Sequence, residues 1–90
     1  MNYDLVLHPR AQRELDRVPA DRFRHLDAAL SALRDNPRPQ GIKKLNDQLY
    51  RIRVGEWRVI FAIVDHAHRV VILRVARRSE RTYKGLPHLR

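Results

Sequence analysis

The sequence predicts an α+β domain in which a strand and a helical hairpin precede an antiparallel β-meander. Two observations favour this fold class. Apolar residues recur at steps of three and four up to about residue 34, as on one face of a helix. Beyond residue 41 they alternate with polar residues until about residue 77, as in strands with one buried face. A chain of 90 residues is expected to form one domain over residues 1–90, with one modest core.

The first elements are a short strand over residues 3–7 and a short helix over residues 9–18. Pro9 suits the first position of this helix because the N–H that proline lacks would have no helical partner there. The apolar positions at helical spacing are Ala11, Leu15 and Val18.

A second helix is expected to begin at Pro19 in the same way and to end near Arg34. Its apolar face comprises Phe23, Leu26, Leu30 and Leu33. Asp21 lies in the first turn, where a negative charge suits the helix dipole. Residues 35–41 include two prolines and a glycine, so they cannot continue the helix. The two helices should pack as a hairpin against the apolar face of the meander.

The most informative segment is the alternating run over residues 50–61, interrupted only by Gly55-Glu56. A Gly-X pair between two alternating runs predicts a two-residue type II′ hairpin turn. Successive side chains of a strand point to opposite faces, so the turn defines two faces. One face suits the core and carries Tyr50, Ile52, Val54, Trp57, Val59, Phe61 and Ile63. The other carries Leu49, Arg51, Arg53, Arg58, Ile60 and Ala62.

This second face, called the arginine face below, gathers Arg51, Arg53 and Arg58. The predicted turn places Arg53 directly opposite Arg58. Like charges across a strand pair are destabilising by roughly 0.2–1 kcal/mol, so folding alone does not favour this arrangement. We expect the helices to leave the arginine face open and an anion to bind there.

A third strand of the meander is expected over residues 70–75, and two connections to it fit the sequence. A two-residue turn would direct Arg74 into the core. A three-residue loop pairs Leu73 with Phe61 and places Arg74 on the arginine face, opposite Ile60. The second register avoids burying an unpaired charge and is the one we predict.

The charge of the chain also indicates an anionic partner. The formal charge is +9, from 19 basic and 10 acidic residues, and only three of the basic residues are lysine. Arginine presents a planar fork that matches phosphate and carboxylate. The balance indicates nucleic acid or an acidic protein. The chain has no cysteine and no apolar run of membrane-spanning length, so we expect a cytoplasmic protein.

The candidate site is the arginine face together with residues 77–84, just after the last strand. Guanidinium groups hold phosphate through paired, charge-assisted hydrogen bonds and can stabilise the charge of a pentacoordinate transition state. Tyr83 could stack under a base or take part in proton transfer. The plainer alternatives are a solvated basic face and a tyrosine that packs at the sheet edge. His66 and His68 lack a third ligand and no phosphate-binding glycine loop is present, so we expect neither metal nor cofactor.

Several segments together resemble one protein family over almost the whole chain. They are His8-Pro9-Arg10-Ala11 with Glu14-Leu15, Asn36-Pro37-Arg38, Lys44-Leu45, the run from Tyr50 to Phe61, and Arg74-Val75-Ala76-Arg77-Arg78 leading to Tyr83. With these segments the chain resembles the RelE/ParE superfamily of toxin–antitoxin toxins, and the run from Tyr50 to Phe61 is the specific part. The resemblance implies a small α+β domain of the microbial-ribonuclease type.

In the RelE branch, the resemblance implies a ribosome-dependent endoribonuclease that cleaves messenger RNA by attack of a 2′-hydroxyl on the adjacent phosphate. Arg51 and Arg53 then occupy the places of the family's basic pair. Arg58 matches the arginine after the hairpin.

The C-terminal part of the implied site is less determined. The arginine that follows the last strand in the family corresponds to Arg77 or Arg78. The spacing to Tyr83, which matches the family's C-terminal tyrosine, favours Arg77, whereas the local motif favours Arg78.

One departure from the family concerns proton transfer. The best-known RelE enzymes carry lysines where this chain has Arg51 and Arg53, and arginine stays protonated, so it cannot readily act as a general base. Activation of the hydroxyl would then fall to Tyr83, or to the RNA and ribosome.

Two other functions fit the same sequence. The ParE branch implies a non-enzymatic inhibitor of DNA gyrase, and the basic face alone would suit a protein-binding module. In the toxin interpretation, a cognate antitoxin and mRNA on the ribosome are the implied partners. Complementary charge would mainly speed the encounter with an acidic antitoxin.

Overall fold

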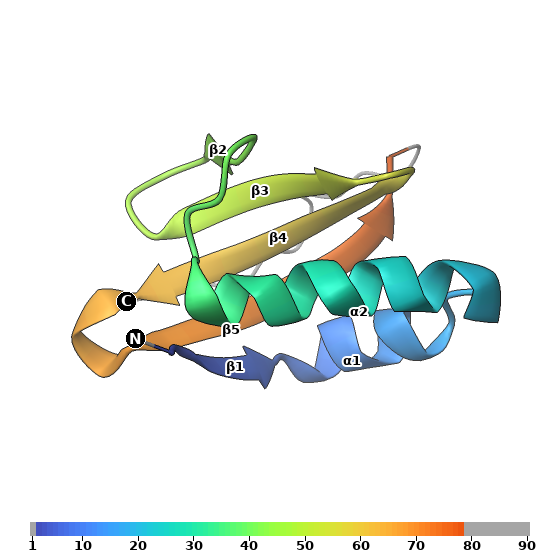
Figure 1. The fold of residues 1–90 in the computed structure, drawn as a ribbon, viewed down its shortest axis with the longest axis horizontal. Coiled ribbons are helices and arrows are strands. Elements are labelled where there is room, and N and C mark those ends of the chain that lie inside the picture. Colours follow the sequence, from blue (N-terminus) through green and yellow to red (C-terminus); the bar gives the residue numbers. More distant parts are fainter. Residues whose placement is uncertain (1, 79–90) are drawn as a thin grey trace.

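The structure is a computed structural model that describes residues 2–78, and within this range two helices pack on one face of a five-stranded sheet (Figure 1). The elements are β1 (Asp4–Leu7), α1 (Pro9–Asp16), α2 (Ala20–Asp35), β2 (Lys43–Lys44), β3 (Leu49–Val54), β4 (Trp57–Val64), η1 (Asp65–Ala67) and β5 (Arg69–Arg77). The strand order is β1-β5-β4-β3-β2. β1 runs parallel to β5, and the other pairs are antiparallel. The α+β prediction is therefore confirmed.

The two prolines begin the helices as the sequence predicts. Pro9 occupies the first turn of α1, and Nδ1 of His8 accepts a hydrogen bond from the amide of Arg10 at 3.2 Å. Pro19 is the residue that precedes α2. α1 ends at Asp16, slightly earlier than expected. Neither helix in the described range is long and apolar enough to cross a lipid bilayer.

The main core lies between the helices and the sheet. The meander contributes the apolar face that the sequence predicts, and its buried members are Tyr50, Val54, Val59, Phe61, Ile63, Val70, Ile72 and Val75. The helices contribute Ala11, Leu15, Leu26, Leu30 and Leu33. Phe23 was expected on the same stripe, but it is 39% exposed, so this part of the prediction is wrong. The first turns of α2 extend past the end of the sheet in Figure 1.

Substitutions at the buried Ile72 and at the exposed Phe23 are expected to change the free energy of unfolding by different amounts. We expect Ile72→Val to lower the free energy of unfolding by about 0.5–1.5 kcal/mol, because Ile72 is fully buried. Phe23→Leu should change it by less than about 0.5 kcal/mol, since the ring is largely exposed. Urea unfolding followed by circular dichroism measures both, and a larger loss for Phe23→Leu would contradict this assignment.

The connection between β4 and β5 differs from the prediction. Four residues separate Val64 from Arg69, and they include the short helix η1 and His68, whose φ is 47°. Near this loop, Phe61 pairs with Ile72 and not with Leu73. Further along, Ile60 pairs with Arg74 as predicted. The register therefore changes by one residue between Ile60 and Phe61, and β5 contains a β-bulge there.

Arg74 does not lie on the arginine face, although it pairs with Ile60. Its side chain is buried and binds the carboxylate of Glu14 in α1, with Nη2 donating to Oε2 at 2.7 Å. The bulge allows this because it frees the residue from the regular alternation. Arg74 is not buried unpaired, as predicted, but its carboxylate partner was not predicted.

The arginine face is only partly open, which corrects the expectation that the whole face is uncovered. Leu49, Ile60, Ala62 and Leu73 form a second buried apolar cluster on it. Leu45, from the segment before β3, packs against this cluster. The arginines are therefore confined to the end of the sheet at the β3–β4 turn and to the edge beside β2.

At the opposite end of the sheet, Asp65 joins three segments of the chain. Its carboxylate accepts two hydrogen bonds from the guanidinium of Arg38, at 3.1 and 2.8 Å, and one from the hydroxyl of Tyr3 at 2.8 Å. The hydrogen bonds from Arg38 and then Tyr3 lower the pKa of Asp65 from 3.8 to about 2. The same contact with Asp65 raises the pKa of Tyr3.

This contact predicts a pH-dependent contribution to stability. Because the pKa is lower in the folded state, the contribution is fully present above about pH 4 and is lost as the pH falls towards 2. The side chains of Arg38 and Asp65 are 45% and 56% exposed, so we expect less than about 1 kcal/mol. Urea unfolding of the wild type and Asp65→Asn should differ at pH 6 and converge near pH 2. The exposed Asp47 offers the control Asp47→Asn, and a difference between wild type and Asp65→Asn that persists at pH 2 would contradict the assignment.

Candidate nucleic-acid interface

The site is built on the turn between β3 and β4. Gly55 has a φ of 58°, and Glu56 is not among the described residues with positive φ, as a type II′ turn requires. Arg53 pairs with Arg58 and Val54 with Trp57, which confirms the predicted register. The core on the other face fixes this register, because a one-residue slip would turn the apolar side chains to the wrong side.

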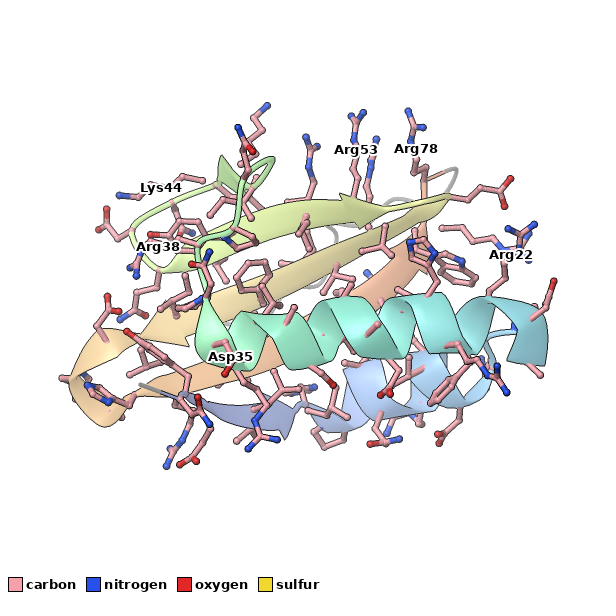
Figure 2. The ribbon with its side chains drawn as sticks, in the orientation of Figure 1. Arg22, Asp35, Arg38, Lys44, Arg53 and Arg78 are labelled. Atoms are coloured by element: carbon pink, nitrogen blue, oxygen red, sulfur yellow. The ribbon has the colours of Figure 1, made fainter. Side chains whose placement is uncertain are left out.

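Three arginines meet on the face turned away from the helices. Arg53 and Arg58 lie opposite each other at the end of the β3–β4 hairpin. Arg78 follows the last residue of β5, and its amide donates to the carbonyl of Glu56 at 2.9 Å, which extends the ladder by one step. Figure 2 shows the side chains of Arg53 and Arg78 projecting together, on the side away from α2. We call Arg53, Arg58 and Arg78 the arginine cluster.

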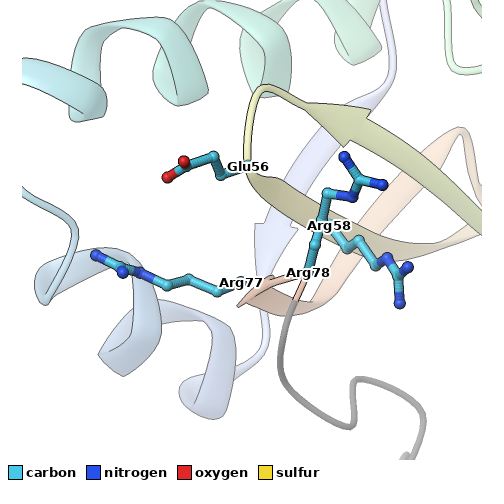
Figure 3. Close-up of a pocket in the computed structure, with 4 residues that line it drawn as sticks. All are labelled: Glu56, Arg58, Arg77 and Arg78. Carbon is cyan, nitrogen blue, oxygen red and sulfur yellow. The ribbon is translucent and has the colours of Figure 1, made fainter.

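Arg77 lies on the opposite side of the sheet from the cluster. It pairs with Trp57, and its guanidinium lies 5.3 Å from the centre of the Trp57 ring. Trp57 packs against the main core, so the stacked arginine belongs to the helix side. Figure 3 shows Arg77 pointing away from Arg58 and Arg78. Of the two residues that the sequence left open, the structure brings Arg78 to the cluster.

A pocket of about 460 Å³ lies at this end of the sheet and is lined by Glu56, Arg58, Arg77 and Arg78 (Figure 3). Nε of Arg58 is buried and has no hydrogen-bond partner within the described residues. A buried donor without an acceptor costs about 1–3 kcal/mol. An anionic oxygen bound beside Arg58 would recover this cost, so the pocket is suited to an anion.

The other predicted site residues lie further away or outside the described range. Arg51 lies on the same face as Arg53, two residues further from the turn. It pairs with Ile60 and so lies beside the second apolar cluster. Tyr83 falls outside the described residues. The position of the tyrosine relative to the arginine cluster therefore stays a prediction.

Glu56 lines the pocket, although the sequence predicted it only as part of the turn. The sequence feature that could have identified Glu56 as a pocket residue is its position after Gly55, which places it beside the arginines. Its side chain points away from Arg58 and Arg78 in Figure 3, on the same side as Arg77. Glu56 therefore points away from the side of the pocket where a phosphate would meet Arg58 and Arg78.

The cluster has the chemistry of a phosphodiester site. Guanidinium groups on a rigid hairpin and an adjoining strand can each donate two hydrogen bonds to phosphate oxygens. Fixed donors of this kind also stabilise charge that develops during a reaction, because they need no reorganisation. No group of three or more possible metal ligands occurs among residues 2–78.

Comparisons with known proteins found similar sequences and structures. The family model of the ParE toxin of the type II toxin–antitoxin system parDE matches residues 5–82. The toxin RelE of Mycobacterium tuberculosis is 35% identical over 80 residues, which are 86% of this chain and 82% of that protein. The archaeal RelE–RelB complex from Pyrococcus horikoshii contains a similar fold, with a TM-score of 0.80 at 25% identity, over 89% of this chain and 99% of that one. The RelBE2 toxin–antitoxin complex from M. tuberculosis gives 0.73 at 27% identity, over 87% of this chain and 100% of that one.

Proposed function

Since this chain belongs to the RelE/ParE superfamily of type II toxins, we propose that it is a ribosome-dependent endoribonuclease that cleaves messenger RNA and so arrests translation. The 35% identity to a toxin named RelE supports the RelE-like branch. The observation that carries the proposal is the pocket beside Arg58 and Arg78, with Arg53 paired to Arg58, in which the buried Nε of Arg58 has no hydrogen-bond partner among residues 2–78.

The proposed reaction is an intramolecular transfer within the RNA. The 2′-hydroxyl attacks the adjacent phosphorus and gives its proton to a base, while the bond to the 5′-oxygen of the next nucleotide breaks and that oxygen takes up a proton from solvent. The products are a 2′,3′-cyclic phosphate and a 5′-hydroxyl. The phosphorane between these states carries extra negative charge on its oxygens. Arg58 and Arg78 bind these oxygens more strongly in the transition state than in the substrate, which accelerates the step.

Binding and proton transfer are assigned to different groups. Arg53 and Arg51 extend the basic surface along β3 and would bind the neighbouring phosphates of the RNA. Glu56 is the one carboxylate among the described residues that line the pocket, and it points away from Arg58 and Arg78. We therefore assign activation of the 2′-hydroxyl to Tyr83, or to the ribosome-bound RNA.

The proposal includes a cognate antitoxin as the physiological inhibitor. The RelE proteins of P. horikoshii and M. tuberculosis were crystallised as complexes with antitoxins. This chain carries a formal charge of +9, so an acidic antitoxin segment would be attracted to it. Cleavage should disappear when the purified toxin is mixed with the product of an adjacent antitoxin gene.

The match to the ParE family model favours a second candidate, which is inhibition of DNA gyrase without any chemical step. A brief pulse of expression separates the two. The ribonuclease produces new 5′ ends in translated transcripts and leaves plasmid supercoiling unchanged. Loss of supercoiling with intact transcripts would replace the first proposal by the second. If the protein neither cleaves transcripts nor changes supercoiling, the remaining interpretation is that the basic face binds another protein.

A further inference from the structure

The β-bulge in β5 determines which arginine reaches the cluster. Before the bulge, even-numbered residues such as Ile72 face the core, and after it the odd-numbered Val75 does. Arg77 therefore lies over Trp57 on the core side. In a regular strand that kept all these residues but had no bulge, Val75 would turn away from the core, and Arg77 would take the side that Arg78 now occupies.

The bulge is held by one carboxylate from α1. Oε1 of Glu14 accepts a hydrogen bond from the amide of Val75 at 2.9 Å and another from Nε of Arg74 at 3.1 Å. Oε2 accepts from Nε at 2.9 Å and from Nη2 at 2.7 Å. The side chains of Arg74 and Glu14 are only 4% and 19% exposed. Such a buried, multiply bonded pair has a defined geometry, unlike an exposed ion pair.

Glu14 supplies the hydrogen-bond acceptor that a neighbouring strand would otherwise provide. β1 pairs with β5 only as far as Leu7 and Ile72, and the chain then turns into α1. Beyond that point the amide of Val75 has Glu14 as its acceptor. A buried backbone amide without an acceptor is strongly disfavoured, so this side chain compensates for the end of β1.

We propose that Glu14 is a positioning residue of the phosphate site, which acts through the bulge to place Arg78 beside Arg58 and Arg77 over Trp57. The inference deepens the proposed function and rests on it for its catalytic consequence. Its structural part, the side of the sheet that Arg77 occupies, is independent of that function. Glu14 itself lies on α1 and touches neither Arg58 nor Arg78 in any described contact.

Two variants without the carboxylate form the test. Glu14→Met with Arg74→Met retains the extra residue, and it should fold because apolar replacement of a buried ion pair is commonly tolerated. The strand then becomes regular, with the new methionine side chain directed to the core and Arg77 to the cluster side. Glu14→Met with deletion of Arg74 removes the extra residue instead. The deletion preserves the side of every later residue, so this variant keeps Arg78 in the cluster.

Trp57 is the one tryptophan of the chain, so its fluorescence reports whether Arg77 stacks on it. We expect a shifted emission maximum and about a hundredfold slower mRNA cleavage in the double methionine variant. The deletion variant should keep the wild-type emission and cleavage. Equal emission in the two variants would overturn the inference. If the emission differs as expected while the wild type cleaves no mRNA, the positioning role stands and the proposed function fails.

Glu14→Gln provides a second route that does not depend on the methionine variants. It keeps the shape of the side chain but loses the charge that binds Arg74. Weakening the hydrogen bond to Val75 should make the Val75 amide exchange with solvent roughly tenfold faster. A folded Glu14→Gln protein with wild-type exchange at Val75 and wild-type Trp57 emission would also overturn the inference.

Discussion

Arg58→Ala is expected to lower the rate of mRNA cleavage on programmed ribosomes by about 10²–10³-fold, which corresponds to about 2.7–4 kcal/mol of transition-state stabilisation. Arg58 lines the pocket, and its Nε is buried without a partner among the described residues. Its removal takes away a fixed donor at the pocket. The substitution should also relieve the repulsion from Arg53, so the folded protein should be at least as stable as the wild type.

The matched control is Arg69→Ala, which removes an exposed arginine at the other end of the sheet. It lowers the net charge by the same amount but should change the cleavage rate by less than about threefold, because long-range attraction is largely screened at physiological salt. Primer extension on a defined transcript measures both variants. Wild-type cleavage by Arg58→Ala, or an equal loss in Arg69→Ala, would contradict the assignment of the phosphate site.

The two arginines after the last strand are expected to differ sharply. Arg78→Ala should reduce cleavage by about a hundredfold, since Arg78 belongs to the cluster and a fixed donor to the phosphorane is lost. Arg77→Ala should reduce it by less than about tenfold, because the guanidinium stacks on Trp57 on the far side of the sheet and the lost interaction is of the order of 1 kcal/mol.

Fluorescence supplies a control for this comparison. Arg77→Ala should shift the emission of Trp57 while leaving cleavage largely intact, whereas Arg78→Ala should leave the emission unchanged. A larger loss of cleavage in Arg77→Ala than in Arg78→Ala would show that Arg77 is the residue that acts on the RNA.

Much of the fold could be predicted because short-range rules decide it. Pro9 and Pro19 set the helix starts, and Gly55 set the turn that pairs Arg53 with Arg58. The alternation of the meander then selected the core face. These features depend on residues that are close in the sequence, so one sequence is enough to predict them.

The features that the sequence did not predict depend on contacts between distant segments. The partner of Arg74 is Glu14, 60 residues earlier, and no local pattern connects the two. The bulge follows from that contact, so the choice between Arg77 and Arg78 could not be made without it. The burial of Ile60 and Leu73 on the arginine face was missed for the same reason, because no local pattern shows that Leu45 packs against them.

The parallel pairing of the first and last described strands also determines when the toxin acquires its site during synthesis. Tyr3 and Asp65, which are joined by a hydrogen bond, are 62 positions apart, and β5 follows Asp65. At a synthesis rate of about 5–20 residues per second, β5 leaves the ribosome several seconds after β1. Arg78 is later still. A ribosome that makes this protein is therefore expected to finish most of the chain before the nascent product has its arginine cluster.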